Sequence, residues 1–176
     1  NWLEAAHGIM TTDTEPKIAT RQRTINGEVV TVTGIAKGSG MIQPNMATML
    51  SYIASDVTAT KATLKACLLA AGDRSFNRIT VDSDTSTNDS CMLSATGVSS
   101  VDIDVDEKAH EQFVQMLNEV CLELAQGIIR DGEGATKFVA VEVGSSESRS
   151  DSLNIAYAIA NSPLMKTALF ASDANW

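Results

Sequence analysis

The chain has few of the side chains on which catalytic and metal sites most often depend. Its 176 residues include two histidines, His7 and His110, and three cysteines, Cys67, Cys91 and Cys121. The cysteines are odd in number and widely spaced, which fits neither a disulfide framework nor a C-x-x-C redox or metal site. Two histidines exclude a histidine-rich zinc site. A hydrolase or transferase built on this chain therefore needs another base.

Basic residues and long apolar runs are scarce as well. Thirteen Lys and Arg stand against 22 Asp and Glu, which gives a formal net charge of −9. Nucleic acids and anionic membranes bind basic surfaces, so we expect neither as a partner. No run approaches the roughly 18 apolar residues of a membrane span, and the first residues lack the pattern of a signal peptide. We expect a cytoplasmic protein.

The chain does have enough apolar sequence for a core, since 44% of its residues are hydrophobic. Apolar side chains at helical spacing predict helices over residues 2–10, 58–71, 106–128 and 163–171. Strand-like runs lie at residues 18–25, 28–35, 48–54, 76–81 and 138–143. Asn26-Gly27 predicts a type I′ hairpin between the first two of these strands. The order of elements predicts an α/β or α+β fold.

The most informative stretch, residues 37–50, reads Lys-Gly-Ser-Gly-Met-Ile-Gln-Pro-Asn-Met-Ala-Thr-Met-Leu. It sets a glycine-rich loop before a hydroxyl residue, Thr48, that opens an apolar run. A threonine hydroxyl is a poor nucleophile and needs a base beside it. If the chain is cut before Thr48, the new α-amine, with an unperturbed pKa of about 7.7 to 8.0, can accept the proton. Thr48 is therefore a candidate nucleophile, although an ordinary loop entering a buried strand fits the spacing too.

Other residues invite a metal or nucleotide interpretation that the spacing rejects. Asp82, Asp84 and Asp89 stand among hydroxyl residues, yet an EF-hand loop needs Gly at its sixth position and Glu at its twelfth. The chain has Thr87 and Leu93 there. The glycine-rich loop matches neither the P-loop nor the dinucleotide fingerprint. We expect no metal and no cofactor.

Four motifs resemble one family. Residues 37–50 resemble the self-cleavage site of the ornithine acetyltransferases of arginine biosynthesis, also called glutamate N-acetyltransferases. The motifs at residues 11–17, 81–90 and 130–137 resemble the same family in the same order. The similarity runs from Trp2 to Trp176, and a family precursor is more than twice this long. The resemblance implies that residues 1–176 are a single central portion of the enzyme, with 1–47 ending the N-terminal α chain and 48–176 beginning the C-terminal β chain. A serine-rich connector at residues 144–152 is a candidate subdomain boundary.

The resemblance implies an acyltransferase that cleaves itself between Ala47 and Thr48. It would then move an acetyl group from N-acetylornithine to glutamate through an ester on Thr48. Thr48 would be catalytic, and Thr11, Lys37, Thr48 and Glu133 would bind substrate, with acetyl-CoA as a further candidate substrate.

The family also implies an assembly and a layered fold. Cleavage would leave an α-β heterodimer, which assembles into a higher homo-oligomer. The fold would have layers of helices on either side of a sheet. In the family, a Thr-Gly pair upstream of this chain stabilises the oxyanion. Because oxyanion donors contribute strongly to catalysis, we expect little or no transferase activity from this chain alone.

Two other functions stay open. A self-processed N-terminal-nucleophile amidase or aminopeptidase would use the same Thr48 but pass the acyl group to water. An inactive portion of the transferase would keep the bond between Ala47 and Thr48 intact and would not bind N-acetylornithine. One assay separates the amidase from the transferase: a transferase moves the acetyl group to glutamate, whereas an amidase hydrolyses the acetyl donor.

Overall fold

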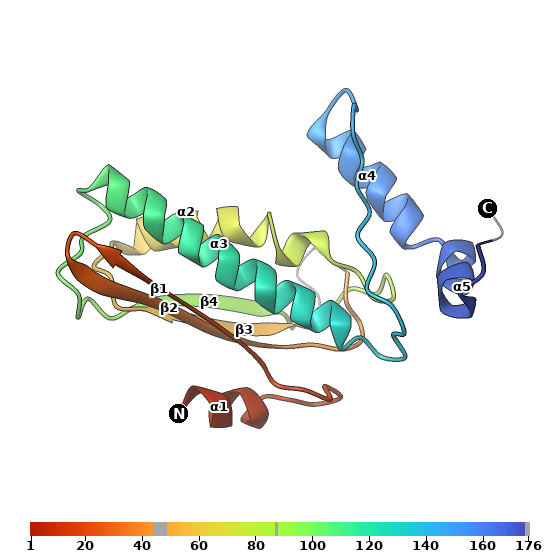
Figure 1. Ribbon diagram of the computed structural model, residues 1–176, viewed down its shortest axis with the longest axis horizontal. Helices are drawn as coiled ribbons and strands as arrows, with labels where there is room; N and C mark the ends of the chain where they lie inside the picture. The colour runs from red at the N-terminus through yellow and green to blue at the C-terminus, as the bar shows by residue number, and fades with distance from the viewer. Residues whose placement is uncertain (44–48, 87, 175–176) are drawn as a thin grey trace.

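A mixed four-stranded sheet forms the centre of the molecule (Figure 1). The computed structural model describes residues 1–43, 49–86 and 88–174. The strands, in sheet order, are β1 (Lys17–Ile25), β2 (Glu28–Lys37), β3 (Leu50–Ser55) and β4 (Ser90–Ala95). The pairs β1–β2 and β2–β3 are antiparallel, and β3–β4 is parallel. An antiparallel meander is thus followed by a βαβ unit, which confirms the predicted mixture of helix and sheet.

The hairpin between β1 and β2 forms at the predicted turn. Asn26 has φ of 53° and Gly27 has φ of 86°. Two consecutive positive φ angles define a type I′ turn, whose twist matches that of the flanking strands. Ile25 consequently pairs with Glu28, and the register runs unbroken to Lys17 opposite Ala36. The turn chemistry therefore fixes which β1 residues face the core.

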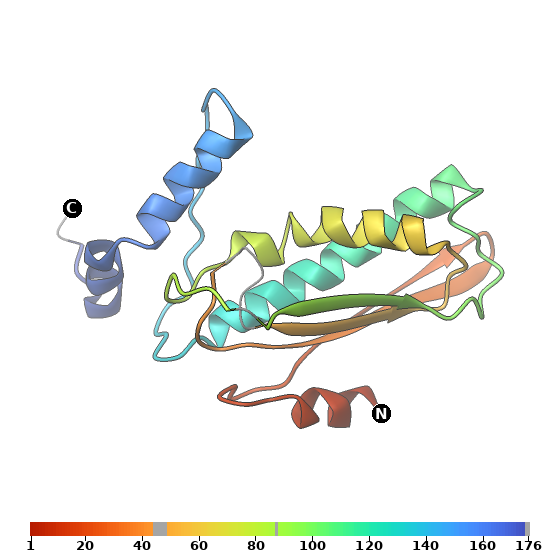
Figure 2. The same cartoon turned by 180° about the vertical axis from the view of Figure 1, so that it is seen from behind.

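Helices cover both faces of the sheet. The helices α2 (Lys61–Gly72) and α3 (Glu107–Arg130) lie on one face, and the short α1 (Trp2–Gly8) lies on the other (Figures 1 and 2). The buried side of α3 holds Phe113, Met116, Leu117, Val120, Cys121, Leu124 and Ile128. These residues recur three and four apart, as an amphipathic helix requires. They pack against buried residues of the sheet such as Val30, Val32 and Ile53.

Caps mark the helix starts: those predicted after Asp106 and at Pro163 are confirmed, whereas the helix predicted from residue 58 begins at Lys61. Thr60 accepts a hydrogen bond from the Thr63 amide, and Asp106 accepts one from the Ala109 amide at 3.0 Å. Ser162 caps α5 (Pro163–Ala171), which has proline in its first turn. Each cap satisfies an amide that has no partner within its own helix.

One predicted strand is wrong, and one strand was not predicted. Residues 76–81 form a short 3₁₀ turn, Phe76–Arg78, followed by extended chain. Phe76 is buried in the core within that turn. The apolar residue that suggested a strand therefore packs in the core without taking part in the sheet. The parallel partner of β3 is instead β4, whose half-buried Cys91 and Leu93 pack against the core.

The C-terminal part differs from the prediction too. Residues 138–143 have alternating valines but form no strand. A strand must share its backbone hydrogen bonds with a neighbour, and within the described residues no strand pairs with this segment. An unpredicted helix, α4 (Arg149–Ala160), begins inside the serine-rich connector, and it lies beside α5 at one side of the molecule (Figure 1). Across residues 1–43, 49–86 and 88–174, no helix is long and apolar enough to cross a membrane.

Candidate functional site

The glycine-rich loop leaves the sheet at Lys37, the last residue of β2. Gly38 and Ser39 follow it and are buried. The carboxylate of Asp13 accepts the Gly38 amide N–H at 2.7 Å with Oδ1, and it accepts the Thr11 amide N–H at 3.1 Å with Oδ2. One buried carboxylate therefore holds the backbone beside two of the predicted substrate residues, Lys37 and Thr11.

The side chains of Lys37 and Thr11 meet at the surface. Lys37 Nζ donates to Thr11 Oγ1 at 3.5 Å. Thr11 is exposed and Lys37 is half-buried, so the ammonium group can be reached from solvent. These two residues are 26 positions apart. The structure places the side chains of these two predicted substrate residues next to each other.

Glu133 reaches the same loop from the C-terminal end of α3. Its backbone N–H donates to the carbonyl of Ser39 at 3.0 Å, and Ser39 Oγ donates to the carbonyl of Asp131 at 2.7 Å. The loop and the turn after α3 are thus joined by two hydrogen bonds. Lys37, Thr11 and Glu133 all border the loop.

The predicted nucleophile Thr48 and the predicted cleavage partner Ala47 lie outside the described residues. The chain is described again at Met49, whose amide donates to Asp89 Oδ1 at 2.6 Å. Asp82 accepts the amide of Ile42 at 2.9 Å and that of Met41. Both flanks of this segment are therefore held by carboxylates of one motif, residues 81–90.

A constant offset of 40 residues relates these two stretches of chain. Leu50 pairs with Ser90 at the start of the parallel strands, and Met49 lies opposite Asp89 in the same sense. The Ile42 amide reaches Asp82 with the same separation of 40. The motif at residues 81–90 therefore contacts the chain at Ile42 and again from Met49 onward.

Asp89 has one satisfied oxygen and one unsatisfied oxygen. Oδ2 is buried and has no hydrogen-bond partner within the described residues. Burial raises the pKa of Asp89, and neither the hydrogen bond from the Met49 amide nor the charge of Lys37 offsets this effect. Asp89 also lines a cavity of about 140 Å³, whose other lining side chains include Ile42, Met49 and Phe76.

A cluster of three charged residues, here named the Lys17 cluster, lies beneath the loop. Lys17 Nζ donates to Asp13 Oδ1 at 2.5 Å and also donates to Asp131. Burial alone would raise the pKa of Asp13, but hydrogen bonds from Lys17, Gly38 and Thr11 outweigh it and hold that pKa below its ordinary value. In Asp131, burial is likewise outweighed by Lys17 and Thr14, so its pKa is lowered too. Both carboxylates are therefore held in their charged form.

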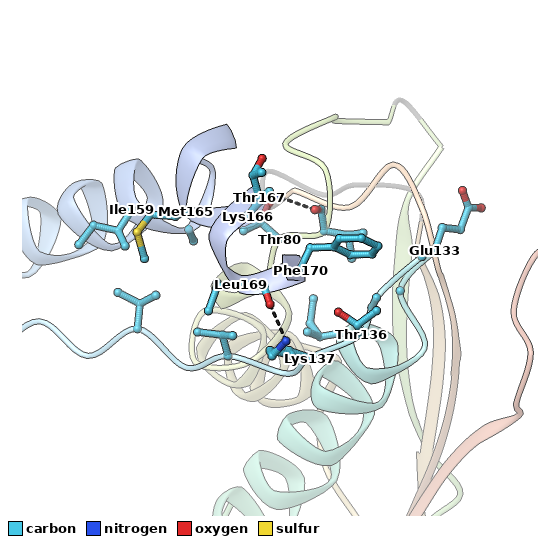
Figure 3. A pocket seen from close by; sticks show the side chains of 18 residues that line it. Thr80, Glu133, Thr136, Lys137, Ile159, Met165, Lys166, Thr167, Leu169 and Phe170 are labelled. Atoms are coloured by element: carbon cyan, nitrogen blue, oxygen red, sulfur yellow. Dashed lines mark hydrogen bonds between the residues drawn. The ribbon is translucent and has the colours of Figure 1, made fainter. Parts of the chain in front are cut away.

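A second cavity, of about 460 Å³, lies beside the turn that carries Glu133 (Figure 3). Two lysines border it, and the ammonium group of each already donates a hydrogen bond to a backbone carbonyl. Lys137 donates to the carbonyl of Leu169 at 2.5 Å, and Lys166 donates to the carbonyl of Val81. The Glu133 carboxylate points away from Leu169 and the other apolar lining of α5 (Figure 3). This cavity lies between α5 and the body, and Glu133 is among its lining residues, whereas Lys37 and Thr11 are not.

Comparison with known proteins identifies a family over almost the whole chain. The family model described as the ArgJ family matches residues 2–176. The chain belongs to the ArgJ family. It is 54% identical over 178 residues to the arginine biosynthesis bifunctional protein ArgJ of Pseudomonas syringae pv. tomato, a match that covers 100% of this chain and 44% of that protein. The protein of the same name from Pseudomonas fluorescens is 54% identical over 179 residues, with the same coverage of 100% and 44%.

A solved structure supports the same family. The crystal structure of the arginine biosynthesis bifunctional protein ArgJ from Bacillus halodurans matches with a TM-score of 0.65 and 38% identity. That match covers 69% of this chain and 57% of the other. The family predicted from four motifs is confirmed. The chain spans less than half the length of the curated ArgJ proteins that it matches.

The motifs at residues 11–17 and 130–137 indicated the family, but the sequence did not show what most of their residues do. Asp13 and Lys17 lie in the first motif and Asp131 in the last, and no role was assigned to any of them. The one signal in the sequence for an ion pair between the two motifs was that they carry residues of opposite charge. No three His, Cys, Asp or Glu side chains in the described parts of the chain are grouped so as to hold a metal ion.

Proposed function

We propose that this chain is the central portion of an acyltransferase that moves an acetyl group from N-acetylornithine to glutamate. Membership of the ArgJ family and relatives named as arginine biosynthesis proteins support this function. The proposal assigns substrate binding to Thr11, Lys37, Thr48 and Glu133 and nucleophilic catalysis to Thr48. Residues 1–47 and 48–176 would belong to the two chains of a self-cleaved heterodimer, which assembles further with copies of itself.

The observation that carries the proposal is the grouping around the glycine-rich loop. An ammonium group, Lys37, and a carboxylate, Glu133, border the same short loop, and the Thr11 hydroxyl lies 3.5 Å from the ammonium. N-Acetylornithine and glutamate both carry carboxylates, and each carries a positive amine. A cation and an anion that border one loop match such substrates through charge-assisted hydrogen bonds.

Self-cleavage would proceed by an N-to-O shift. Thr48 Oγ attacks the carbonyl carbon of Ala47, the peptide C–N bond breaks, and the released nitrogen takes up a proton. Water then hydrolyses the resulting ester, which leaves a carboxylate on Ala47 and restores the hydroxyl of Thr48. The new α-amine stands next to that hydroxyl and can act as its base near neutral pH.

Acetyl transfer would use the same two groups. Thr48 Oγ attacks the acetyl carbonyl of N-acetylornithine while its proton passes to the α-amine and then to the departing ornithine nitrogen. The acetyl group stays on Thr48 as an ester. The amine of glutamate attacks this ester, the bond between the acetyl carbon and Thr48 Oγ breaks, and a proton from the glutamate amine passes through the α-amine to Thr48 Oγ. The reaction needs no histidine, which suits a chain with two histidines, both outside this grouping. We propose that the enzyme acts in the cytoplasm.

Mass spectrometry of the native protein that carries these residues tests the nucleophile. We expect two chains under denaturing conditions, the second beginning at Thr48, and a single chain for Thr48→Ala. Thr24→Ala is a matched control, because Thr24 is exposed on β1 far from the loop in sequence, and this variant should still be cut. An uncut wild-type chain would refute self-cleavage and favour an inactive portion of the transferase.

An assay with acetyl-labelled N-acetylornithine separates transfer from hydrolysis. With glutamate present, a transferase yields labelled N-acetylglutamate, whereas an amidase yields labelled acetate whether or not glutamate is added. Replacing the donor with acetyl-CoA tests the further candidate substrate in the same experiment. Labelled acetate as the main product in both conditions would replace the transferase proposal by the amidase.

A further inference from the structure

The Asp13 carboxylate is surrounded by hydrogen-bond donors. Its side chain is 0% exposed, and Lys17 Nζ lies 2.5 Å from Oδ1. The Gly38 amide donates to the same oxygen at 2.7 Å, and the Thr11 amide donates to Oδ2 at 3.1 Å. Three donors thus converge on one buried side chain. Two of them belong to backbone that carries, or directly follows, a proposed substrate residue.

We propose that Asp13 is a positioning residue that sets the spacing between Thr11 and Lys37, with Lys17 as its counter-ion. The inference rests on the proposed function for what Thr11 and Lys37 bind. Thr11 is held through its own amide, and Lys37 through the amide of the next residue. Asp13 touches no substrate atom in this scheme and acts through the two residues whose backbone it holds.

Lys17 extends the same control to Glu133. Its ammonium group also donates to Asp131, which lies two residues before Glu133 and whose carbonyl accepts from Ser39 Oγ at 2.7 Å. Gly127 in the last turn of α3 leaves room for the lysine stem, because a Cβ there would lie 3.1 Å from Lys17 Cγ. The Lys17 cluster therefore connects the backbone on both sides of the loop.

A carboxylate is needed at position 13 because all three partners donate. An asparagine of the same shape has one acceptor oxygen, and its NH₂ group would face at least one of the three donors. Asp13→Asn therefore preserves volume while it breaks part of the arrangement. Aspartate is acceptor-only when ionised, and the hydrogen bonds here favour the ionised form.

Amide hydrogen exchange in the native protein tests the positioning without substrate. We expect the Gly38 amide, the Thr11 amide or both to exchange about tenfold faster or more in Asp13→Asn, according to which of them faces the new NH₂ group, with the core amides of α3 unchanged, since local opening exposes only the amides that lose a partner. Asp104→Asn is the matched control: Asp104 accepts the Thr60 amide at 2.6 Å and lies outside the Lys17 cluster. Unchanged exchange at both Gly38 and Thr11 in a folded Asp13→Asn would overturn the proposal.

Wild-type protein gives a second test that does not depend on a folded variant. Lys17 and Asp131 are the other charged groups of the cluster that faces Asp13. On acidification, the Gly38 amide resonance should titrate together with the Asp13 carboxyl carbon. A Gly38 resonance that is insensitive to the protonation of Asp13 would contradict the assigned contact.

A double-mutant cycle connects the positioning to substrate binding. Asp13→Asn should weaken N-acetylornithine binding by about 10- to 100-fold, the scale expected when a binding group is misplaced by about 1 Å. In a Lys37→Ala background the same change should cost much less, because Asp13 acts partly through Lys37. Full additivity would indicate a general structural role. If wild-type protein does not bind N-acetylornithine, the proposed function fails, while the exchange experiment still decides whether Asp13 holds the loop.

Discussion

Gly40 is what allows Glu133 to lie against the glycine-rich loop. A Cβ atom at Gly40 would lie 2.9 Å from the carboxyl carbon of Glu133 and 3.0 Å from each of its oxygens. Real Cβ atoms do not approach other atoms this closely, so any larger residue at position 40 displaces the carboxylate. The glycine is therefore tied to a specific side chain 93 positions away and not to the flexibility of the loop in general.

Gly40→Ala is accordingly expected to reduce substrate affinity while the fold remains stable. The group that must move is the end of a flexible, exposed side chain, so the free energy of unfolding should change by less than about 1 kcal/mol. Calorimetric titration of the native protein with N-acetylornithine should show weaker binding than wild type. Gly8→Ala, where nothing lies within 4 Å of the new Cβ, is the control and should bind as wild type does. Unchanged binding by Gly40→Ala would argue against a role for Glu133 in the substrate site.

Gly34 presents the opposite case, because its neighbours cannot move freely. A Cβ there would lie 3.0 Å from Leu124 Cδ1 and 3.1 Å from both Ile53 Cγ1 and Val120 Cγ1. These side chains belong to the packed core between β2, β3 and α3. We expect Gly34→Ala to lower the free energy of unfolding by about 1 to 3 kcal/mol, the usual cost of overpacking. Urea denaturation should show a lower midpoint with an unchanged slope. Gly72→Ala, with open space around its Cβ, should not.

The elements that were predicted correctly are those whose signals are local. The hairpin depends on Asn26-Gly27, and α3 depends on an apolar face of its own and on the cap at Asp106. The missed strand β4 and the wrong strand at residues 138–143 depend on partners distant in sequence. β4 exists because β3 lies beside it, whereas no described strand lies beside residues 138–143. Pairing over long separations leaves little trace in the spacing of one segment.

The sequence named candidate residues for the site but not their arrangement. Motifs pointed to Thr11, Lys37 and Glu133, and the structure brings these three residues to one loop. The buried carboxylate of Asp13 accepts hydrogen bonds from the backbone of Thr11 and Gly38, yet in the sequence it looks like an ordinary acidic residue in a polar stretch. Its three donors lie at positions 11, 17 and 38, and only folding brings them together. Asp131 escaped notice for the same reason.

Acid should weaken the fold through Asp131. Because its pKa is lower in the folded protein than its ordinary value of 3.8, the ionised carboxylate stabilises the fold at higher pH, and this stability is lost as the pH falls through the folded value. Wild type should therefore be more stable than Asp131→Asn by a constant amount above about pH 5, and the difference should shrink below the ordinary pKa. Denaturant titrations between pH 3 and pH 7 measure it. Val98→Ala, at an exposed position without a titratable group, should differ from wild type equally at every pH.

Asp89 should show the opposite pH dependence. Burial raises its pKa in the folded protein, so the fold loses stability as the pH rises from 3.8 through the folded value. Asp89→Asn keeps an acceptor for the Met49 amide but cannot ionise, and its stability relative to wild type should therefore rise over that range and then level off. Asp89→Leu removes the acceptor as well. It should be less stable than Asp89→Asn by about 1 to 3 kcal/mol at every pH, because the Met49 amide is left unpaired. If Asp89→Asn instead lost stability relative to wild type as the pH rose, the ionised carboxylate would be favoured by the fold. Asp89 would then resemble Asp13 as a charged anchor beside the segment that carries the proposed nucleophile.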